Sequence, residues 1–277
     1  MSLNSINTNV GSQIALQTLN STNSALETAQ NQISTGLRVA GAQDDGAIWS
    51  IAQGQRSQIT ALSAVTDSLN RASSVLDVAV TAGQTISDLL NQLKSKALEG
   101  SDTSLSSTDR AALNSSFKSL VSQISSAVAN ASFDGGNLIS SGSTAIVALS
   151  GPSATQKLTL AAQSLALGGA NVSLTASASF STATHAASLL TVINNSITNT
   201  NAAVAALGTE ANEVTSSLTF VSNLSDSLNQ GVGNLVDADV AAESATLQAL
   251  QTKQQLGIQA LSIANSSSSN LLSLFRG

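Results

Sequence analysis

The C-terminal part of the chain carries apolar residues at the spacing of a helix. Between residues 240 and 275 they recur at steps of three and four, with polar or small rungs at Glu243, Gln254, Gly257 and Ser268. Such spacing places the apolar side chains on one stripe of an α-helix, which needs a second helix or another molecule to cover it. The apolar members of this stripe are Val240, Leu247, Leu250, Leu261, Ala264, Leu271 and Phe275.

The N-terminal part shows a comparable pattern. Residues 4–35 predict a helix with a polar face rich in Asn, Thr and Gln. Since neither terminal stripe has another obvious partner, we expect the two terminal helices to pair with each other or with those of further copies. We therefore interpret both stripes as self-assembly surfaces. The apolar members at this end are Ile6, Val10, Leu16, Leu19, Leu26, Ala29 and Ile33.

A longer heptad pattern occupies the middle of the chain. It runs without a miss from Leu62 to Ala97, which predicts a coiled-coil helix roughly 50 Å long at about 1.5 Å per residue. Gly100 should end this helix, and Ser106 with Asp109 three residues later predicts a capping box for the next one. That next helix should stop near residues 133–136.

The heptad pattern returns in residues 190–235. Thr200 interrupts its apolar seam, and Gly231 and Gly233 are expected to interrupt the helix and form a hinge before the terminal one. The seam residues that we expect to hold the central helices together are Leu62, Leu69, Leu76, Leu90, Ile193, Val204 and Leu218.

Residues 137–180 differ in character from the helical parts. Short β-prone runs at 145–149, 157–161 and 171–176 are separated by the turn signals Gly151-Pro152 and Gly168-Gly169. This pattern predicts a small insert rich in β-hairpins.

The predicted fold is mainly α: a long coiled-coil helical bundle of paired N- and C-terminal halves with this β insert. We expect a terminal-helix pair with its linker at 1–43 and 235–277. A three-helix coiled-coil domain should comprise 44–136 and 181–234, and the small outer β insert 137–180.

Composition narrows the function. Only 9% of the 277 residues are charged, against about 25% in ordinary soluble domains. A surface of small neutral polar groups loses little hydration energy when it packs against a neighbour. The net charge of −6 without a basic run argues against nucleic-acid binding. The chain has no cysteine, no stretch apolar enough for a membrane span and no pattern of a cleavable secretory signal.

Candidate chemistry is sparse. His185 is the only histidine, and no catalytic or zinc motif accompanies it. Gly231-Val232-Gly233 lacks the strand and third glycine of a phosphate loop. We predict no catalytic residue, no metal and no cofactor, and hence no enzyme. Four linker carboxylates have two interpretations, capping of helix starts, which we favour, or joint binding of a cation. They are Asp44, Asp45, Asp237 and Asp239.

Several short motifs near both ends resemble those of bacterial flagellin. The resemblance covers roughly residues 3–135 and 185–276. It is carried by Ile6–Asn9, Ile33–Arg38, Ala42–Asp45 and Phe133-Asp134-Gly135, and by Asp237–Asp239 with Ala241 and Glu243, Gln254–Gly257, Ala264-Asn265 and Leu271–Leu274.

The resemblance implies an extracellular structural subunit that polymerises into the flagellar filament used for motility. It also implies an inner tube of terminal helices, an outer tube of the three-helix part and a solvent-facing β insert. The implied partners are copies of the chain, the export apparatus and a chaperone, the junction and cap proteins of the filament, and sibling flagellins. Two alternatives stay open: a hook–filament junction protein of the same superfamily, and a secreted coiled-coil protein with an unrecognised activity.

Overall fold

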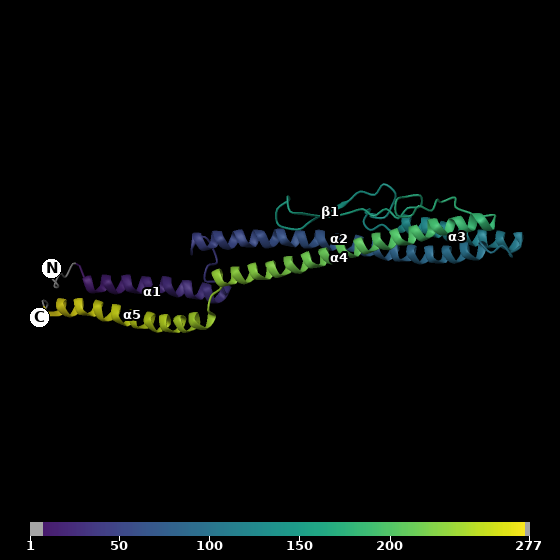
Figure 1. The fold of residues 1–277 in the computed structure, drawn as a ribbon. Helices are drawn as coiled ribbons and strands as arrows, with labels where there is room; N and C mark the ends of the chain where they lie inside the picture. Colours follow the sequence, from purple (N-terminus) through teal and green to yellow (C-terminus); the bar gives the residue numbers. More distant parts are fainter. Residues whose placement is uncertain (1–7, 275–277) are drawn as a thin grey trace. The chain divides into compact units, whose positions relative to one another are not determined.

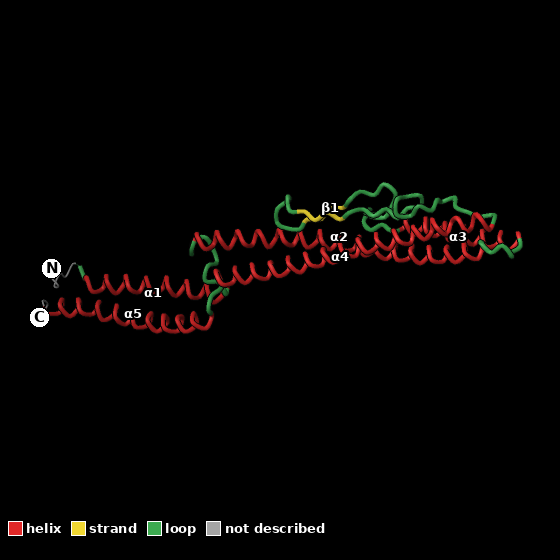
Figure 2. Tube along the Cα trace, in the orientation of Figure 1, coloured by secondary structure: helices red, strands yellow, loops and turns green. Residues whose placement is uncertain are grey.

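The structure, a computed structural model, describes the backbone of residues 8–274 and the side chains of residues 8–266. Five helices and one two-stranded sheet follow each other along these residues (Figures 1 and 2). This confirms the predicted fold class, a mainly helical chain with a small β part. The helices are α1 (Val10–Thr35), α2 (Gly46–Gly100), α3 (Ser107–Asn130), α4 (Ala183–Val236) and α5 (Val240–Leu274), and the strands are β1 (Ile146–Leu149) and β2 (Lys157–Leu160).

The chain divides into two compact units. One comprises residues 1–57 and 227–277, and the other comprises residues 58–226. The first unit holds α1 and α5, and the second holds most of α2 and α4 together with α3 and the strands. The segment predicted as a separate β insert belongs to the second unit.

Helices α2 and α4 pack against each other in antiparallel fashion within the second unit. Ser87 Oγ donates a hydrogen bond to Asn201 Oδ1 at 2.7 Å, and Gly83 faces Val204. The heptad residues supply the apolar layer, because one stripe of each helix turns inward. Of the seam residues, Leu62, Leu69, Leu76, Leu90 and Ile193 are buried, whereas Val204 and Leu218 are half-buried.

Local signals set the ends of α2 and α3. Helix α2 ends at Gly100, as predicted. Ser106 caps α3, since its hydroxyl accepts a hydrogen bond from the Asp109 N–H at 3.1 Å and donates one to the Asp109 carboxylate at 2.6 Å. After α3 the chain reverses at Asp134 and Gly135, which both have positive φ, between the paired backbones of Phe133 and Gly136.

The insert packs its apolar side chains onto the helices. Strands β1 and β2 pair antiparallel in a register that places Ile146 opposite Leu160. The Leu149 N–H donates to Ser68 Oγ of α2 at 3.0 Å, and the Phe180 N–H donates to Asn114 Oδ1 of α3 at 2.9 Å. These bonds hold the end of β1 and the C-terminal end of the insert on the helical bundle.

Three sequence-based predictions about secondary structure are wrong. The helix expected from residue 4 begins at Val10, behind its N-cap Asn9, while residues 4–7 lie outside the described part. Residues 171–176 form no strand: Val172 and Leu174 are buried, but only an isolated bridge from Val172 to Leu167 forms there. Alternating burial therefore occurs here without a neighbouring strand that could complete a ladder.

The expected hinge at Gly231 and Gly233 is absent, because α4 continues to Val236. A Cβ added at Gly233 would lie 2.8 Å from Asp237 Oδ2, and one at Gly231 would lie 3.4 Å from Gln55 Oε1. The glycines thus leave room for neighbouring side chains rather than breaking the helix. Each glycine lowers the stability of the helix by about 1 kcal/mol relative to alanine, and the burial of Val232 and Val236 offsets this cost.

Thr200 does not interrupt the seam either, since it lies fully buried within it. Its hydroxyl has no hydrogen-bond partner among the described residues. The seam therefore continues through a polar rung at the cost of one unpaired hydroxyl.

Gly83 lets α2 and α4 approach closely, and substitution there should destabilise the second unit. An added Cβ would lie 2.6 Å from Val204 Cγ2, and the β-branched valine has little freedom to move. We expect Gly83→Ala to lower the free energy of unfolding by about 1–3 kcal/mol. Urea unfolding followed by circular dichroism measures it. Gly208→Ala is the matched control, because no atom lies within 4 Å of its added Cβ. Equal stability of the two variants would contradict the close approach.

Glu210 of α4 joins the helix to the insert and makes stability depend on pH. The Ala161 N–H donates to Glu210 Oε1 at 3.1 Å, while Glu210 Oε2 is buried without a partner among the described residues. Burial raises the pKa of Glu210, Glu213 nearby raises it further, and the Ala161 hydrogen bond opposes both. A carboxyl whose pKa is raised on folding favours the folded state at low pH, and this contribution is lost as pH rises through the folded pKa.

Replacing Glu210 with glutamine should therefore flatten the pH dependence of stability. As pH falls from neutral to below the ordinary glutamate pKa, we expect the wild-type chain to become more stable relative to Glu210→Gln. The gain in unfolding free energy should be less than about 1 kcal/mol, because the carboxyl is only partly buried. Thermal unfolding at several pH values measures the difference. If the stability of the wild type relative to Glu210→Gln instead increased as pH rose, the raised pKa of Glu210 would be refuted.

Candidate functional site: the paired terminal helices

Helices α1 and α5 lie side by side in antiparallel directions within the first unit (Figure 1). Asn9 Nδ2 donates to the Ala264 carbonyl at 2.8 Å near one end of the pair. Further along, Gln254 Nε2 donates to Asn23 Oδ1 at 2.7 Å. These bonds fix the register of two helices that are more than 200 residues apart in the sequence.

Gly257 allows the two helices to approach each other. A Cβ added there would lie 3.3 Å from Leu19 Cδ1, which is tighter than an ordinary van der Waals contact. Gly257, which interrupts the apolar stripe in the sequence, therefore packs against Leu19 of α1. It is part of the packing rather than a defect in the stripe.

The apolar residues that face each other across the pair are only partly covered. On α1, Ala29 is buried at 3% exposure, and Leu19, Leu26 and Ile33 are half-buried. On α5, the half-buried residues are Leu247, Leu250, Leu261 and Ala264. Two helices cannot enclose a common core, because each still presents most of its circumference to solvent.

The other members of the predicted stripes lie elsewhere. Val10, Leu16 and Val240 are exposed, at 51%, 48% and 45% of their surface. Ile6 and Phe275 lie outside the described residues, and Leu271 lies outside the described side chains. The structure therefore brings together eight of the fourteen stripe residues in the α1–α5 seam. Those eight are Leu19, Leu26, Ala29, Ile33, Leu247, Leu250, Leu261 and Ala264.

A second apolar stripe runs along the outer side of α5, and sequence reasoning missed it. Leu256 and Ile263 are 59% and 70% exposed, and Ala249 and Ala260 continue their line. Ile258 is also 54% exposed. The 3,4 spacing of residues 249, 256, 260 and 263 was a usable signal, but the leucine-rich inner stripe of the same helix concealed it.

Exposed apolar residues also mark α1. Ile14 is 59% exposed and lies one helical turn from Val10. Large apolar side chains on both helices therefore face outward from the pair. Several large apolar side chains exposed on one helix pair indicate an interaction site, since isolated soluble domains seldom expose large apolar patches.

Charge is scarce on both terminal helices. Helix α1 carries only Glu27, and α5 carries only Glu243 and Lys253. Their remaining polar residues are mostly Ser, Thr, Asn and Gln, which lose less hydration energy than charged groups when buried. Neighbouring molecules can therefore cover these helices without stripping water from many charges.

The linker segments between the helices run next to each other in the first unit. Leu37 and Asp237 form an antiparallel bridge, the Arg38 N–H donates to the Val236 carbonyl at 2.7 Å, and the Ala238 N–H donates to the Gly36 carbonyl at 2.9 Å. This backbone pairing ties the end of α1 to the start of α5.

The linker aspartates bond to backbone N–H groups. Asp45 Oδ1 accepts from Ala47 and Ile48 at the start of α2, at 2.9 and 3.0 Å. Asp239 Oδ1 accepts from Ala241 and Ala242 at the start of α5, at 3.0 and 3.1 Å. These contacts are those of helix N-caps.

Asp44 and Asp237 have other neighbours. Asp44 Oδ2 accepts from the N–H groups of Ala40 and Gly41, at 2.9 and 3.0 Å, and so closes a turn in the linker. The Asp237 N–H continues the helical pattern of α4 by donating to the Gly233 carbonyl at 2.8 Å. Within the part of the chain that the structure describes, no three His, Cys, Asp or Glu side chains gather as a metal site would require.

No helix among the described residues is both long enough and apolar enough to cross a lipid bilayer. His185 lies exposed in the first turn of α4, and its backbone N–H donates to Thr182 Oγ1 at 3.2 Å. The arrangement of the described part that stands out chemically is therefore a helix pair with an apolar, nearly uncharged outer surface, suited to association with other protein.

Comparison with known proteins gives matches at both ends of the chain. Residues 6–144 match the family description "Bacterial flagellin N-terminal helical region", and residues 190–275 match "Bacterial flagellin C-terminal helical region". The chain is 50% identical over 276 residues to flagellin FljM of Caulobacter vibrioides, with all of each chain covered. It is 39% identical over 284 residues to a flagellin of Brucella melitensis, with 99% of each covered.

Among solved structures, the crystal structure of Bacillus cereus flagellin is 19% identical to this chain. The match covers 55% of this chain and 86% of that one, with a TM-score of 0.48.

Proposed function

Because this chain belongs to the bacterial flagellin family, we propose that its paired terminal helices are the surface through which it polymerises. The chain is a structural subunit of the extracellular bacterial flagellar filament. The observation that carries the proposal is the apolar outer surface of the α1–α5 pair, with Leu256 and Ile263 at 59% and 70% exposure.

In the polymer, the contact between two successive copies joins one surface of the first copy to a different surface of the second. Head-to-tail association of this kind does not close on itself and so generates an open helical polymer. Its driving force is the burial of apolar area, worth roughly 25 cal/mol per Å². The half-buried seam residues of the pair, such as Leu250 and Leu261, lose further solvent contact when neighbouring copies surround the helices.

The three predicted segments take different places in the assembled filament. Residues 1–43 and 235–277 form the inner tube, and residues 44–136 and 181–234 form the outer tube. Residues 137–180 face the surrounding solvent. The low charge of α1 and α5 supports the inner position, because a subunit surface enclosed on all sides has the most hydration to lose.

Export and assembly require further partners. The chain leaves the cell through the flagellar export apparatus, accompanied by a chaperone. It then meets the junction and cap proteins and sibling flagellins at the growing filament. The chain has no enzymatic role and uses no cofactor. The absence of cysteine from the sequence supports export of an unfolded chain, since no disulfide has to form afterwards.

Seeded polymerisation tests the proposal. Purified chain added to short filament fragments should produce long tubes in negative-stain electron microscopy. A variant that lacks residues 1–35 and 240–277 should leave the fragments unchanged in length, because α1 and α5 are removed. Normal elongation by this truncated variant would refute the proposal. Fragments that bind the intact chain but stop growing would instead identify a junction protein.

A further inference from the structure

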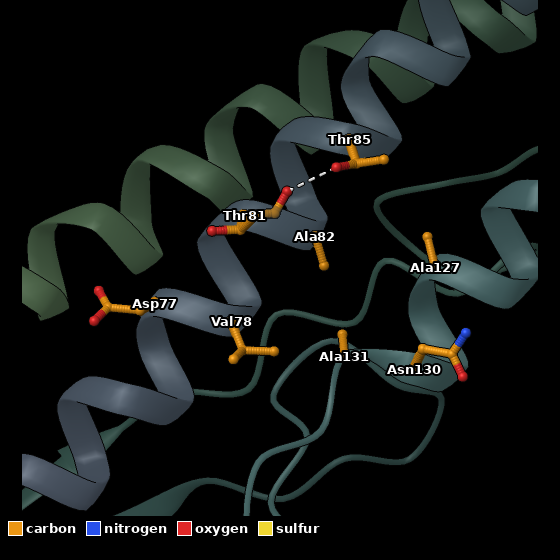
Figure 3. A pocket seen from close by; sticks show the side chains of 8 residues that line it. All are labelled: Asp77, Val78, Thr81, Ala82, Thr85, Ala127, Asn130 and Ala131. Atoms are coloured by element: carbon orange, nitrogen blue, oxygen red, sulfur yellow. Dashed lines mark hydrogen bonds between the residues drawn. The ribbon is translucent and has the colours of Figure 1, made fainter.

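An open apolar groove lies between α2 and α3 in the second unit. Its volume is about 460 Å³, and small side chains form its floor. Figure 3 shows Val78 and Ala82 of α2 pointing toward the gap opposite Ala127 and Ala131 at the end of α3. Larger side chains at these positions would fill the space, so the groove exists because the residues that line it are small.

The groove is large enough for an aromatic ring. A buried cavity of about 150 Å³ lined by apolar side chains already accommodates benzene. Asp77 at the rim is the only charged residue that lines the groove, and the rest of the lining is apolar or neutral. An uncharged ring can therefore enter without displacing water from several ions.

Phe220 on α4 is an exposed aromatic residue in the same unit. Its side chain is 64% exposed, whereas Phe117 and Phe180 are fully buried. The residues one helical turn away, Ser216 and Asn223 among them, are neutral. An exposed aromatic ring with neutral neighbours along its own helix is typical of the anchor of a protein interface.

The groove and Phe220 lie at different levels of the same bundle. The contacts of Gly83 with Val204 and of Ser87 with Asn201 place Phe220 beside the stretch of α2 near Asp67. The centre of the groove is more than a dozen residues further along α2, roughly 20 Å at about 1.5 Å per residue. A chain therefore cannot place Phe220 in its own groove.

We propose that the α2–α3 groove receives Phe220 from a second copy of this chain, with neighbouring copies parallel and displaced by roughly 20 Å along the bundle. The proposal rests on the proposed function, because it assumes that copies assemble side by side. Since groove and ring are different surfaces, each copy offers one of each to its two neighbours. The contact then repeats without closing.

The contact is small, which agrees with a role limited to the polymer. A phenylalanine buries about 150–250 Å². A stable interface between two proteins buries about 1,200–2,000 Å² in total. The ring alone therefore does not hold two free subunits together. It fixes the stagger between copies that the terminal helices already hold side by side.

Cysteine cross-linking tests the stagger directly, because the chain has no cysteine of its own. The variant with both Phe220→Cys and Ala82→Cys is polymerised onto filament fragments and treated with a short bismaleimide. We expect a ladder of dimers, trimers and longer species on a denaturing gel. The control variant carries Phe220→Cys with Gln84→Cys. Gln84 is exposed, and because it lies two residues after Ala82 its side chain is on the opposite side of α2 from the groove.

Each outcome decides the matter. Filaments whose Ala82 pair gives no more cross-linking than the Gln84 pair would overturn the contact. Dimers without longer species would indicate a two-fold contact and overturn the staggered arrangement. Failure of the unmodified chain to form any filament would overturn the proposed function, and the proposed contact with it.

A second variant covers the case in which the cysteine chain fails to polymerise. Phe220→Ala should raise the subunit concentration needed for elongation about tenfold or more, as truncation of an aromatic anchor does. The exposed neighbour Thr219→Ala should leave that concentration unchanged. Circular dichroism of the monomer should be the same for both, since neither side chain is buried. An unchanged elongation threshold in Phe220→Ala would reject the proposal.

Discussion

Replacing Leu256 and Ile263 with aspartate should abolish polymerisation while the α1–α5 pair stays formed. Both side chains lie on the outer stripe of α5, at 59% and 70% exposure, so the folded monomer tolerates a polar group there. In the polymer, a carboxylate at either position would be taken out of water without a partner, at a cost of several kcal/mol per ion. Sedimentation and negative-stain microscopy should show no filaments, and circular dichroism of the monomer should be unchanged.

The matched control places the same two charges one residue away, at the exposed polar positions Gln255 and Ser262. We expect Gln255→Asp with Ser262→Asp to polymerise at a higher subunit concentration but to form filaments. If this control fails as completely as the stripe variant, added charge rather than loss of the apolar stripe is responsible.

The inner stripe gives a contrasting result. Leu250→Asp with Leu261→Asp should also abolish polymerisation, but here because the α1–α5 seam opens. Helical signal from residues 60–220 should persist, because the second unit has its own core. Loss of the whole helical signal would show that the two units do not fold separately.

Phe180→Ala should strongly destabilise the second unit. The Phe180 ring is 1% exposed and packs edge-to-face on Phe117, with ring centroids 5.3 Å apart. It also fills the space over Gly100, where a Cβ would collide with the ring. Removing a buried phenylalanine side chain costs about 3–5 kcal/mol. Urea unfolding of the monomer should show a lower midpoint with little change in slope.

Phe220→Ala is the control for this prediction, because it removes the same atoms from a position that is 64% exposed. Its effect on monomer stability should stay within about 0.5 kcal/mol. A comparable loss from both variants would mean that Phe180 contributes no more to the core than a surface residue does.

Much of the helical framework followed from the sequence because the signals are local. The heptad from Leu62 to Ala97 predicted a long helix, and Ser106 with Asp109 predicted the start of α3. The positions of Asp45 and Asp239 at helix starts agree with the capping interpretation. Helical periodicity and capping depend on residues within one or two turns, so a single chain displays them.

Other features depended on which neighbours a segment meets. Gly231 and Gly233 have the composition of a break, yet α4 continues through them because buried valines and adjacent side chains outweigh their propensity. Residues 171–176 have the composition of a strand but find no partner strand. Local preference is weak in both segments, and tertiary contacts decided the outcome.

The sequence by itself determined that both ends are amphipathic helices with little charge, and that a coiled coil lies between them. Only the tertiary structure decided which stripe of each terminal helix is used within the molecule. The leucines at 247, 250 and 261 face α1, and this leaves Leu256 and Ile263 on the outside. Spacing says which residues share a side of a helix, but the partner that covers a side is a property of the packed chain.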